Sequence, residues 1–164
     1  MTVEELLDLE MRKCFDFLWE TSNHIKGSKG YGLALDRSNN PSLASIASVG
    51  FALTGTVIGV KHGFITYEEG LERAKGTLFT LLHNIPHYKG FFVHFCDMQT
   101  GERYNKSEYS TIDTALCLNG IIVVDACFED PELHEMAEAL LDRTDYSHFI
   151  FYREQKALFR MSYN

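Results

Sequence analysis

The sequence lacks the features that mark the common nucleotide-, nucleic-acid- and membrane-binding classes. Its 164 residues include 15 lysines and arginines against 23 aspartates and glutamates, for a formal net charge of −8. A chain this acidic has no basic face for nucleic-acid phosphates or anionic lipid. No glycine-rich phosphate loop, dinucleotide fingerprint, H-E-x-x-H or G-x-S-x-G motif occurs. We therefore expect no nucleic acid, no membrane and no cofactor as a partner.

Metal-binding and secretory signals are also missing. None of the four cysteines forms a C-x-x-C pair, and each stands among apolar neighbours, which predicts reduced, buried thiols in a cytoplasmic protein. His83 and His87 are four residues apart, but Pro86 between them prevents one helical face from presenting both. We expect no metal site. The N-terminus has neither a basic nor an apolar leader region, so we expect no secretory signal.

Long hydrophobic runs are scarce. Residues 38–60 carry no charge, but asparagine, serine, threonine and glycine interrupt their apolar character. A membrane-spanning helix needs about 20 mostly apolar residues, so we interpret this segment as a helix buried inside the protein. The composition, 45% hydrophobic and 23% charged, is that of an ordinary globular protein. The length predicts one domain over residues 1–164.

Five helices of two kinds are predicted. Three are amphipathic: one begins with a capping box at residues 2–5, one with a capping box at 66–69, and one with a proline in its first turn at 131. The other two, residues 42–61 and 110–128, are almost uniformly apolar. An inner ring of helices sheathed by an outer ring produces this alternation, as in an α/α toroid, although an ordinary helical bundle fits the pattern equally well. Strand-like runs at 90–96, with a return at 102–104, and at 149–161 predict small β-hairpins.

Polar side chains collect just before the two apolar helices. Asp36 and Arg37 precede the first, and Glu108 and Asp113 lie at the start of the second. Both sets are expected at the same end of the ring, because both inner helices start there. Two carboxyl groups that converge on one cleft are what glycosidic cleavage requires. Equally, these residues fit simple helix caps and turn residues.

Two further side chains are candidates by position. Tyr109 stands beside Glu108, and a tyrosine ring can stack on a sugar while its hydroxyl hydrogen-bonds. His94 lies in the predicted strand and either points into the cleft or is a hydrogen-bonded structural histidine. Core packing remains the alternative for the tyrosine.

Five motifs occur in order along the sequence. They are Phe-Asp-Phe-Leu-Trp at 15–19, Gly-Leu-Ala-Leu-Asp-Arg-Ser at 32–38, Ala-Ser-Ile-Ala at 44–47 with Val-Gly-Phe at 49–51, Gly-Phe-Phe-Val-His-Phe at 90–95 with Thr-Gly at 100–101, and Glu-Tyr-Ser-Thr-Ile-Asp-Thr-Ala-Leu at 108–116. In combination these motifs resemble the bacterial glucoamylase-like family, which is related to endo-β-1,2-glucanases and to a domain of cyclic β-1,2-glucan synthases. The motif at 108–116 is the most specific, and the resemblance extends from about residue 11 to about residue 145.

The resemblance implies an all-α fold, a partial (α/α)6 toroid with one or two small β-hairpins, that acts on or binds β-glucan or related oligosaccharides. It implies Glu108 as the proton donor, directly or through a water or a substrate hydroxyl. It implies Asp36 as the group that activates water or holds the sugar. Inversion is the expected stereochemistry, because a water must fit between the carboxylates. The implied substrate-binding or supporting residues are Asp113, Arg37, His94 and Tyr109.

Members of the family are far longer than 164 residues, and this sequence matches the N-terminal half of their toroid. Three explanations stay open: a separate polypeptide supplies the other half, two copies cover each other, or the chain is a remnant without activity. Inner helices left bare on one side would expose more apolar surface than monomers usually do. We therefore expect a homodimer or a partner chain. A non-catalytic carbohydrate-binding or helical oligomerising protein is the alternative function.

Overall fold

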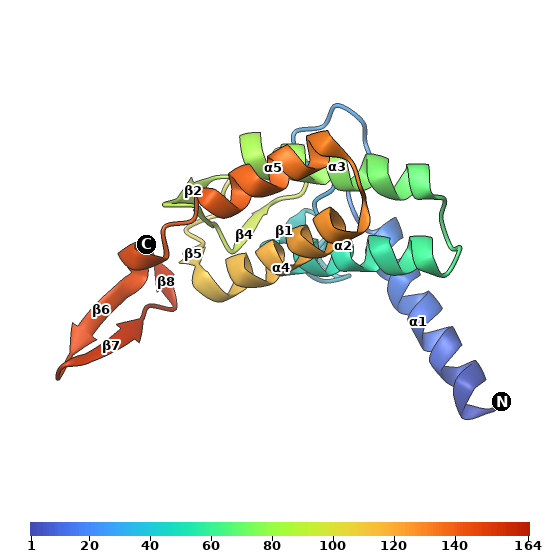
Figure 1. The fold of residues 1–164 in the computed structure, drawn as a ribbon, viewed down its shortest axis with the longest axis horizontal. Coiled ribbons are helices and arrows are strands. Elements are labelled where there is room, and N and C mark those ends of the chain that lie inside the picture. Colours follow the sequence, from blue (N-terminus) through green and yellow to red (C-terminus); the bar gives the residue numbers. More distant parts are fainter.

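The computed structural model describes residues 1–164 as five α-helices joined by loops and short strands (Figure 1). The helices are α1 (Val3–Glu20), α2 (Ile46–Lys61), α3 (Tyr67–His83), α4 (Thr111–Cys127) and α5 (Pro131–Asp142), followed by the 3-10 turn η1 (Tyr146–Phe149). The strands are β1 (Leu43–Ser45), β2 (His87–Tyr88), β3 (Phe91–Phe92), β4 (Phe95–Asp97), β5 (Tyr109–Ser110), β6 (Ile150–Arg153), β7 (Lys156–Phe159) and β8 (Ser162–Tyr163).

Local sequence signals account for the ends of the helices. The Thr2 hydroxyl accepts a hydrogen bond from the backbone N–H of Glu5 at 3.1 Å, and Thr66 caps α3 in the same way. Helix α5 begins at Pro131, and α3 ends before Pro86. These short-range patterns satisfy orphan backbone N–H groups at the starts of α1, α3 and α5 without help from the rest of the fold. All five predicted helices are confirmed.

The inner pair of helices, α2 and α4, packs through glycine. A Cβ on Gly50 would lie 2.2 Å from the carbonyl oxygen of Leu116, and a Cβ on Gly120 would lie 2.3 Å from the carbonyl oxygen of Gly50. The two helices lie side by side in the centre of the molecule, with α3 and α5 above them (Figure 1). The missing side chains let the two backbones approach closely, so the alternation of apolar and amphipathic helices does reflect inner and outer positions.

Both inner helices start at the same end of the molecule, as expected. The backbone N–H of Ile46, the first residue of α2, donates to the carbonyl of His94 at 3.1 Å. The N–H of His94 donates to the carbonyl of Glu108 at 2.8 Å, three residues before α4. The segment between β3 and β4 thus joins the two helix starts.

Three expectations about the helices are wrong. Helix α2 begins at Ile46 rather than at residue 42, because Leu43–Ser45 pair with Phe95–Asp97 as β1 and β4. The inner helices are not buried on all sides: Phe51 and Ile122 are 55% and 50% exposed. The predicted apolar stripe of α1 is mostly exposed, and Phe15 is its only buried residue, because most of α1 extends away from the body (Figure 1).

The predicted hairpins are only partly regular. The C-terminal one is confirmed as β6 and β7, whose turn residues Glu154 and Gln155 have positive φ. The return strand expected at 102–104 is reduced to a single bridge between Cys96 and Arg103. Strand β8 returns to pair with β5, beside the start of α4.

All four cysteines are free, but only Cys96 and Cys117 are buried. The expectation of four buried thiols is wrong for Cys14, which is exposed on α1, and for Cys127, which is half-buried. Burial raises the pKa of the Cys96 thiol to about 12, so this thiol is inert at neutral pH. None of the helices combines the length and the apolar character that crossing a membrane requires.

Candidate active site

A Glu–His–Asp constellation occupies the start of α4. The Nδ1 atom of His94 lies 2.9 Å from Oε1 of Glu108, and its Nε2 atom lies 3.4 Å from Oδ1 of Asp113. The His94 side chain is 25% exposed, so the group is accessible at its rim but not fully solvated. One imidazole therefore links two carboxylates that are five residues apart in the sequence. All three residues were predicted as site residues, and the structure brings them together.

The local fold explains why these side chains meet. His94 follows the buried Val93, and its backbone N–H donates to the carbonyl of Glu108 at 2.8 Å, which brings the two segments together. The ring of Phe95 stacks on the imidazole at a centroid distance of 3.7 Å. On the helix side, Ser110 is the N-cap of α4 and its hydroxyl also donates to the Asp113 carboxylate. The capping interpretation is therefore correct for Ser110, while the Asp113 carboxylate also faces His94.

Hydrogen bonds favour the ionised form of Glu108. Its own backbone N–H, the His94 side chain and the charges of His94 and Arg103 lower the pKa of this carboxyl, and partial burial opposes them. Glu108 is therefore a carboxylate at neutral pH. It can accept a proton or hold a substrate hydroxyl directly, and it can donate a proton only after receiving one from His94, from a water or from a substrate hydroxyl.

Replacing His94 by phenylalanine is expected to raise the pKa of Glu108 towards its usual value, because the hydrogen bond and the positive charge are lost while the stack on Phe95 can persist. A carboxyl 13C NMR titration measures this shift. Asp97 is the internal control, since backbone N–H groups of Thr100 and Gln99 lower its pKa. An unchanged Glu108 titration would contradict the assigned contact.

The sign of the stability effect follows from the same shift. Because the folded-state pKa of Glu108 is lowered, its ionisation stabilises the fold above the unfolded-state pKa, and that stabilisation is lost as the pH falls through the lowered folded-state value. His94→Phe should therefore weaken the acid-side pH dependence of unfolding, measured by urea denaturation between neutral and acidic pH.

Asp36 and Arg37 lie apart from this constellation. Asp36 pairs with the neighbouring Arg37, and no hydrogen bond or ion pair joins either residue to Glu108, His94 or Asp113. The Asp36 side chain is 17% exposed and lines a hollow of about 430 Å³ between α1 and α2, with Phe17 and Phe51 among its walls. Asp36 and Glu108 therefore do not touch each other, and their convergence on one sugar cleft stays a prediction.

Backbone pairing shows where the segments that carry Asp36 and Glu108 lie relative to each other. Leu35 pairs with Ala44 next to β1, β1 pairs with β4, and the segment before β4 pairs with the chain at Glu108. Two strands thus stand between the Asp36 and Glu108 segments, so the backbones of these two segments are not adjacent. Both segments border the same end of the inner helices, but a substrate or a chain of water molecules would have to bridge them.

Tyr109 has a different set of neighbours. The guanidinium of Arg103 lies over its ring at 4.9 Å, and the ring of Tyr88 lies 6.0 Å away. Arg103 was not predicted as a site residue. It reaches the site through the Cys96–Arg103 bridge, the remnant of the return expected at 102–104, but its position over the Tyr109 ring was not predicted.

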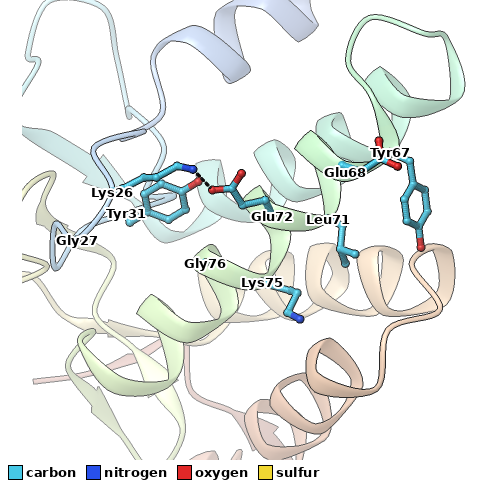
Figure 2. A pocket seen from close by; sticks show the side chains of 9 residues that line it. All are labelled: Lys26, Gly27, Tyr31, Tyr67, Glu68, Leu71, Glu72, Lys75 and Gly76. Atoms are coloured by element: carbon cyan, nitrogen blue, oxygen red, sulfur yellow. Dashed lines mark ion pairs between the residues drawn. The ribbon is translucent and has the colours of Figure 1, made fainter.

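A hollow larger than the one beside Asp36 lies elsewhere, on the outer helix α3 (Figure 2). It has a volume of about 600 Å³ and contains none of the predicted site residues. Its lysines are already paired, Lys26 with Glu72 and Lys75 with Asp130 and Glu132. Because its lysines are held in ion pairs and none of the predicted site residues lines it, size alone does not make this hollow the site of chemistry.

Comparison with solved structures shows which class of fold this chain has. The chain superimposes on a candidate glucoamylase from Bacteroides uniformis with a TM-score of 0.78 and 22% identity, covering 91% of this chain and 38% of that one. It superimposes on an endo-β-1,2-glucanase from Chitinophaga pinensis, solved with sophorotriose and glucose, with a TM-score of 0.76, 16% identity and the same coverage. The fold is therefore the expected partial (α/α)6 toroid of the glucoamylase-like proteins.

Sequence comparison finds a relative of higher identity than these structures. The chain is 34% identical over 106 residues to an exo-β-1,2-glucooligosaccharide sophorohydrolase from Parabacteroides distasonis, a match that covers 62% of this chain and 14% of that protein. A β-1,2-glucanase structure from the same organism matches with a TM-score of 0.74 and 22% identity, over 22% of its chain. No family model matches the sequence. The resemblance to glucoamylase-like proteins and β-1,2-glucanases is confirmed, and the chain spans well under half the length of these relatives.

Proposed function

We propose that this chain forms one wall of the sugar cleft of a glycoside-hydrolase-like protein that acts on β-1,2-linked glucans. The observation that carries the proposal is the Glu108–His94–Asp113 constellation at the start of an inner helix, within a fold shared with β-1,2-glucanases. The sequence match to a sophorohydrolase supports the choice of β-1,2-linked glucose as substrate class.

In this proposal Glu108 is the acid–base residue and works with a proton relayed through His94, a water or a substrate hydroxyl. Asp113 orients the imidazole from its other side, and Tyr109 offers a ring to a sugar. Asp36 and Arg37 hold a more distant part of the substrate or position the attacking water. Asp36 and Glu108 do not pair with each other, and a water held between them would make the reaction inverting, without direct attack by a carboxylate.

A non-catalytic, carbohydrate-binding role is the second candidate. It is favoured by one observation: Asp36 pairs with its neighbour Arg37 and makes no contact with the Glu108–His94–Asp113 constellation. Such a protein would hold a glucan at the start of α4 without cleaving it.

Calorimetry and reducing-sugar release with β-1,2-glucooligosaccharides test the two roles together. Binding with hydrolysis supports the enzyme, and binding without hydrolysis supports the second candidate. The absence of binding to β-1,2-linked sugars, with the chain folded, would overturn both.

We further propose that a second copy or a separate chain covers the open side of the inner helices. Apolar side chains are exposed there on both helices: Phe51 and Ile58 on α2, and Ile112 and Ile122 on α4. Covering apolar surface contributes about 25 cal/mol per Å², and a second copy can do so with twofold symmetry.

Sedimentation at micromolar concentration is expected to show a dimer for the purified chain, and Ile122→Glu is expected to return it to the 18.7 kDa species. Tyr152→Glu, an exposed aromatic on the β6–β7 hairpin, is the control and should leave the assembly unchanged. A wild-type chain that sediments only as a monomer would argue against self-association and leave a separate partner chain as the proposal.

A further inference from the structure

The structure groups one histidine and two carboxylates at the far end of α4. Asp125 lies in the last turns of α4, and His134 and Glu138 lie one turn apart on α5. The three potential ligand atoms lie within 4.8 Å of one another. Nδ1 of His134 is 3.1 Å and 3.2 Å from the two carboxylate oxygens of Asp125. No metal site was predicted from the sequence, because its histidines and cysteines do not cluster at metal-ligand spacing.

We propose that Asp125, His134 and Glu138 form a binding site for a divalent transition-metal ion such as zinc. One imidazole nitrogen and two carboxylate oxygens are a ligand set that zinc accepts, with water in the fourth position. Ligand atoms at about 2.0–2.2 Å from a tetrahedral zinc ion are about 3.4 Å apart. Small rotations of these side chains reach that spacing, since His134 is 60% exposed and free to turn.

Charge supports a cation at this place. No lysine or arginine pairs with Asp125 or Glu138; the nearby Lys75 pairs with Asp130 and Glu132 instead. The adjoining hollow, of about 330 Å³, is also lined by Glu129 and Asp130. Two carboxylates therefore lie close together with no lysine or arginine paired to them, and a divalent ion would neutralise both.

The expected role of the site is structural. Asp125 is twelve residues along α4 from Asp113, which is about 18 Å along a helix, so the metal would lie at the opposite end of the helix from Glu108. Its ligands come from both arms of the α4–α5 hairpin, so a bound ion would fix α5 against the inner helix. The proposal does not depend on the proposed carbohydrate function.

Calorimetric titration of the whole chain with zinc chloride tests the site. One equivalent is expected to bind and to raise the thermal midpoint of the wild type. His134→Ala and Glu138→Gln are each expected to weaken binding about tenfold or more. His83→Ala removes another exposed histidine, which packs on Phe79 and touches no carboxylate, and should bind zinc as the wild type does.

Three results would overturn the proposal. The first is zinc binding to His134→Ala with wild-type affinity, and the second is no zinc binding by the wild type. The third concerns the half-buried Cys127, two residues from Asp125. The Co²⁺-loaded protein is expected to show no thiolate charge-transfer band, and a band that disappears in Cys127→Ser would assign the metal to the cysteine instead.

Discussion

Gly50→Val is expected to destabilise the protein by about 3 kcal/mol or more, or to prevent folding. A Cβ at this position would lie 2.2 Å from a backbone carbonyl of α4 and 2.8 Å from the Cα of Cys117. Backbone atoms cannot move aside as a flexible side chain can, so the two inner helices would have to separate. Urea denaturation followed by circular dichroism measures the loss.

Gly55→Ala, in the same helix, is the matched control. Its Cβ would meet only the Leu18 side chain, the nearest atom being 3.3 Å away. Alanine is favoured over glycine inside a helix by up to about 1 kcal/mol, so this variant should be as stable as the wild type or more stable. Equal unfolding midpoints for Gly50→Val and Gly55→Ala would show that α2 and α4 do not pack through glycine.

Glu108→Gln is expected to lower the rate of β-1,2-glucan hydrolysis by about 10²–10⁴, measured on the assembly that hydrolyses the substrate. Glutamine has the same shape and can still hydrogen-bond a sugar, but it cannot accept or return a proton. Oligosaccharide affinity should therefore change only a few-fold, which separates loss of chemistry from loss of binding.

Glu102→Gln is the control for this experiment. Glu102 is exposed after β4, and only its backbone is hydrogen-bonded: its carbonyl accepts from the N–H of Asp97, and its N–H donates to the hydroxyl of Thr100. Hydrolysis should persist in this variant. Full hydrolysis by Glu108→Gln would show that Glu108 is not the acid–base residue, and would leave Asp36 and Asp113 as the candidates for that role.

Short-range chemistry made much of the fold predictable. The threonine caps at Thr2 and Thr66 and the proline at Pro131 act within one helical turn, so the sequence alone located three helix starts. The start of α2 was misjudged because the pairing of β1 with β4 joins residues about 50 positions apart. Local pattern carries no information about such a partner.

The site was predictable in its members but not in its contacts. Glu108, His94 and Asp113 were each identified, yet only the path of the chain between β3 and β4 shows that one imidazole touches both carboxylates. Asp36 was expected to meet Glu108 because both precede inner helices, and that reasoning fixes the end of the molecule but not the two strands between them. The apolar sequence pattern likewise did not predict the exposure of Phe51 and Ile122, because it does not distinguish a helix face that is covered from one that is open.

The most direct test of the account is an NMR titration of the isotope-labelled chain with a β-1,2-linked glucotriose. The account predicts that the largest shift changes fall on His94, Glu108 and Asp113, with smaller ones at Asp36. Changes confined to the α3 hollow around Tyr31 and Glu72, or no changes at any concentration of sugar, would contradict the claim that the start of α4 is where this protein meets its substrate.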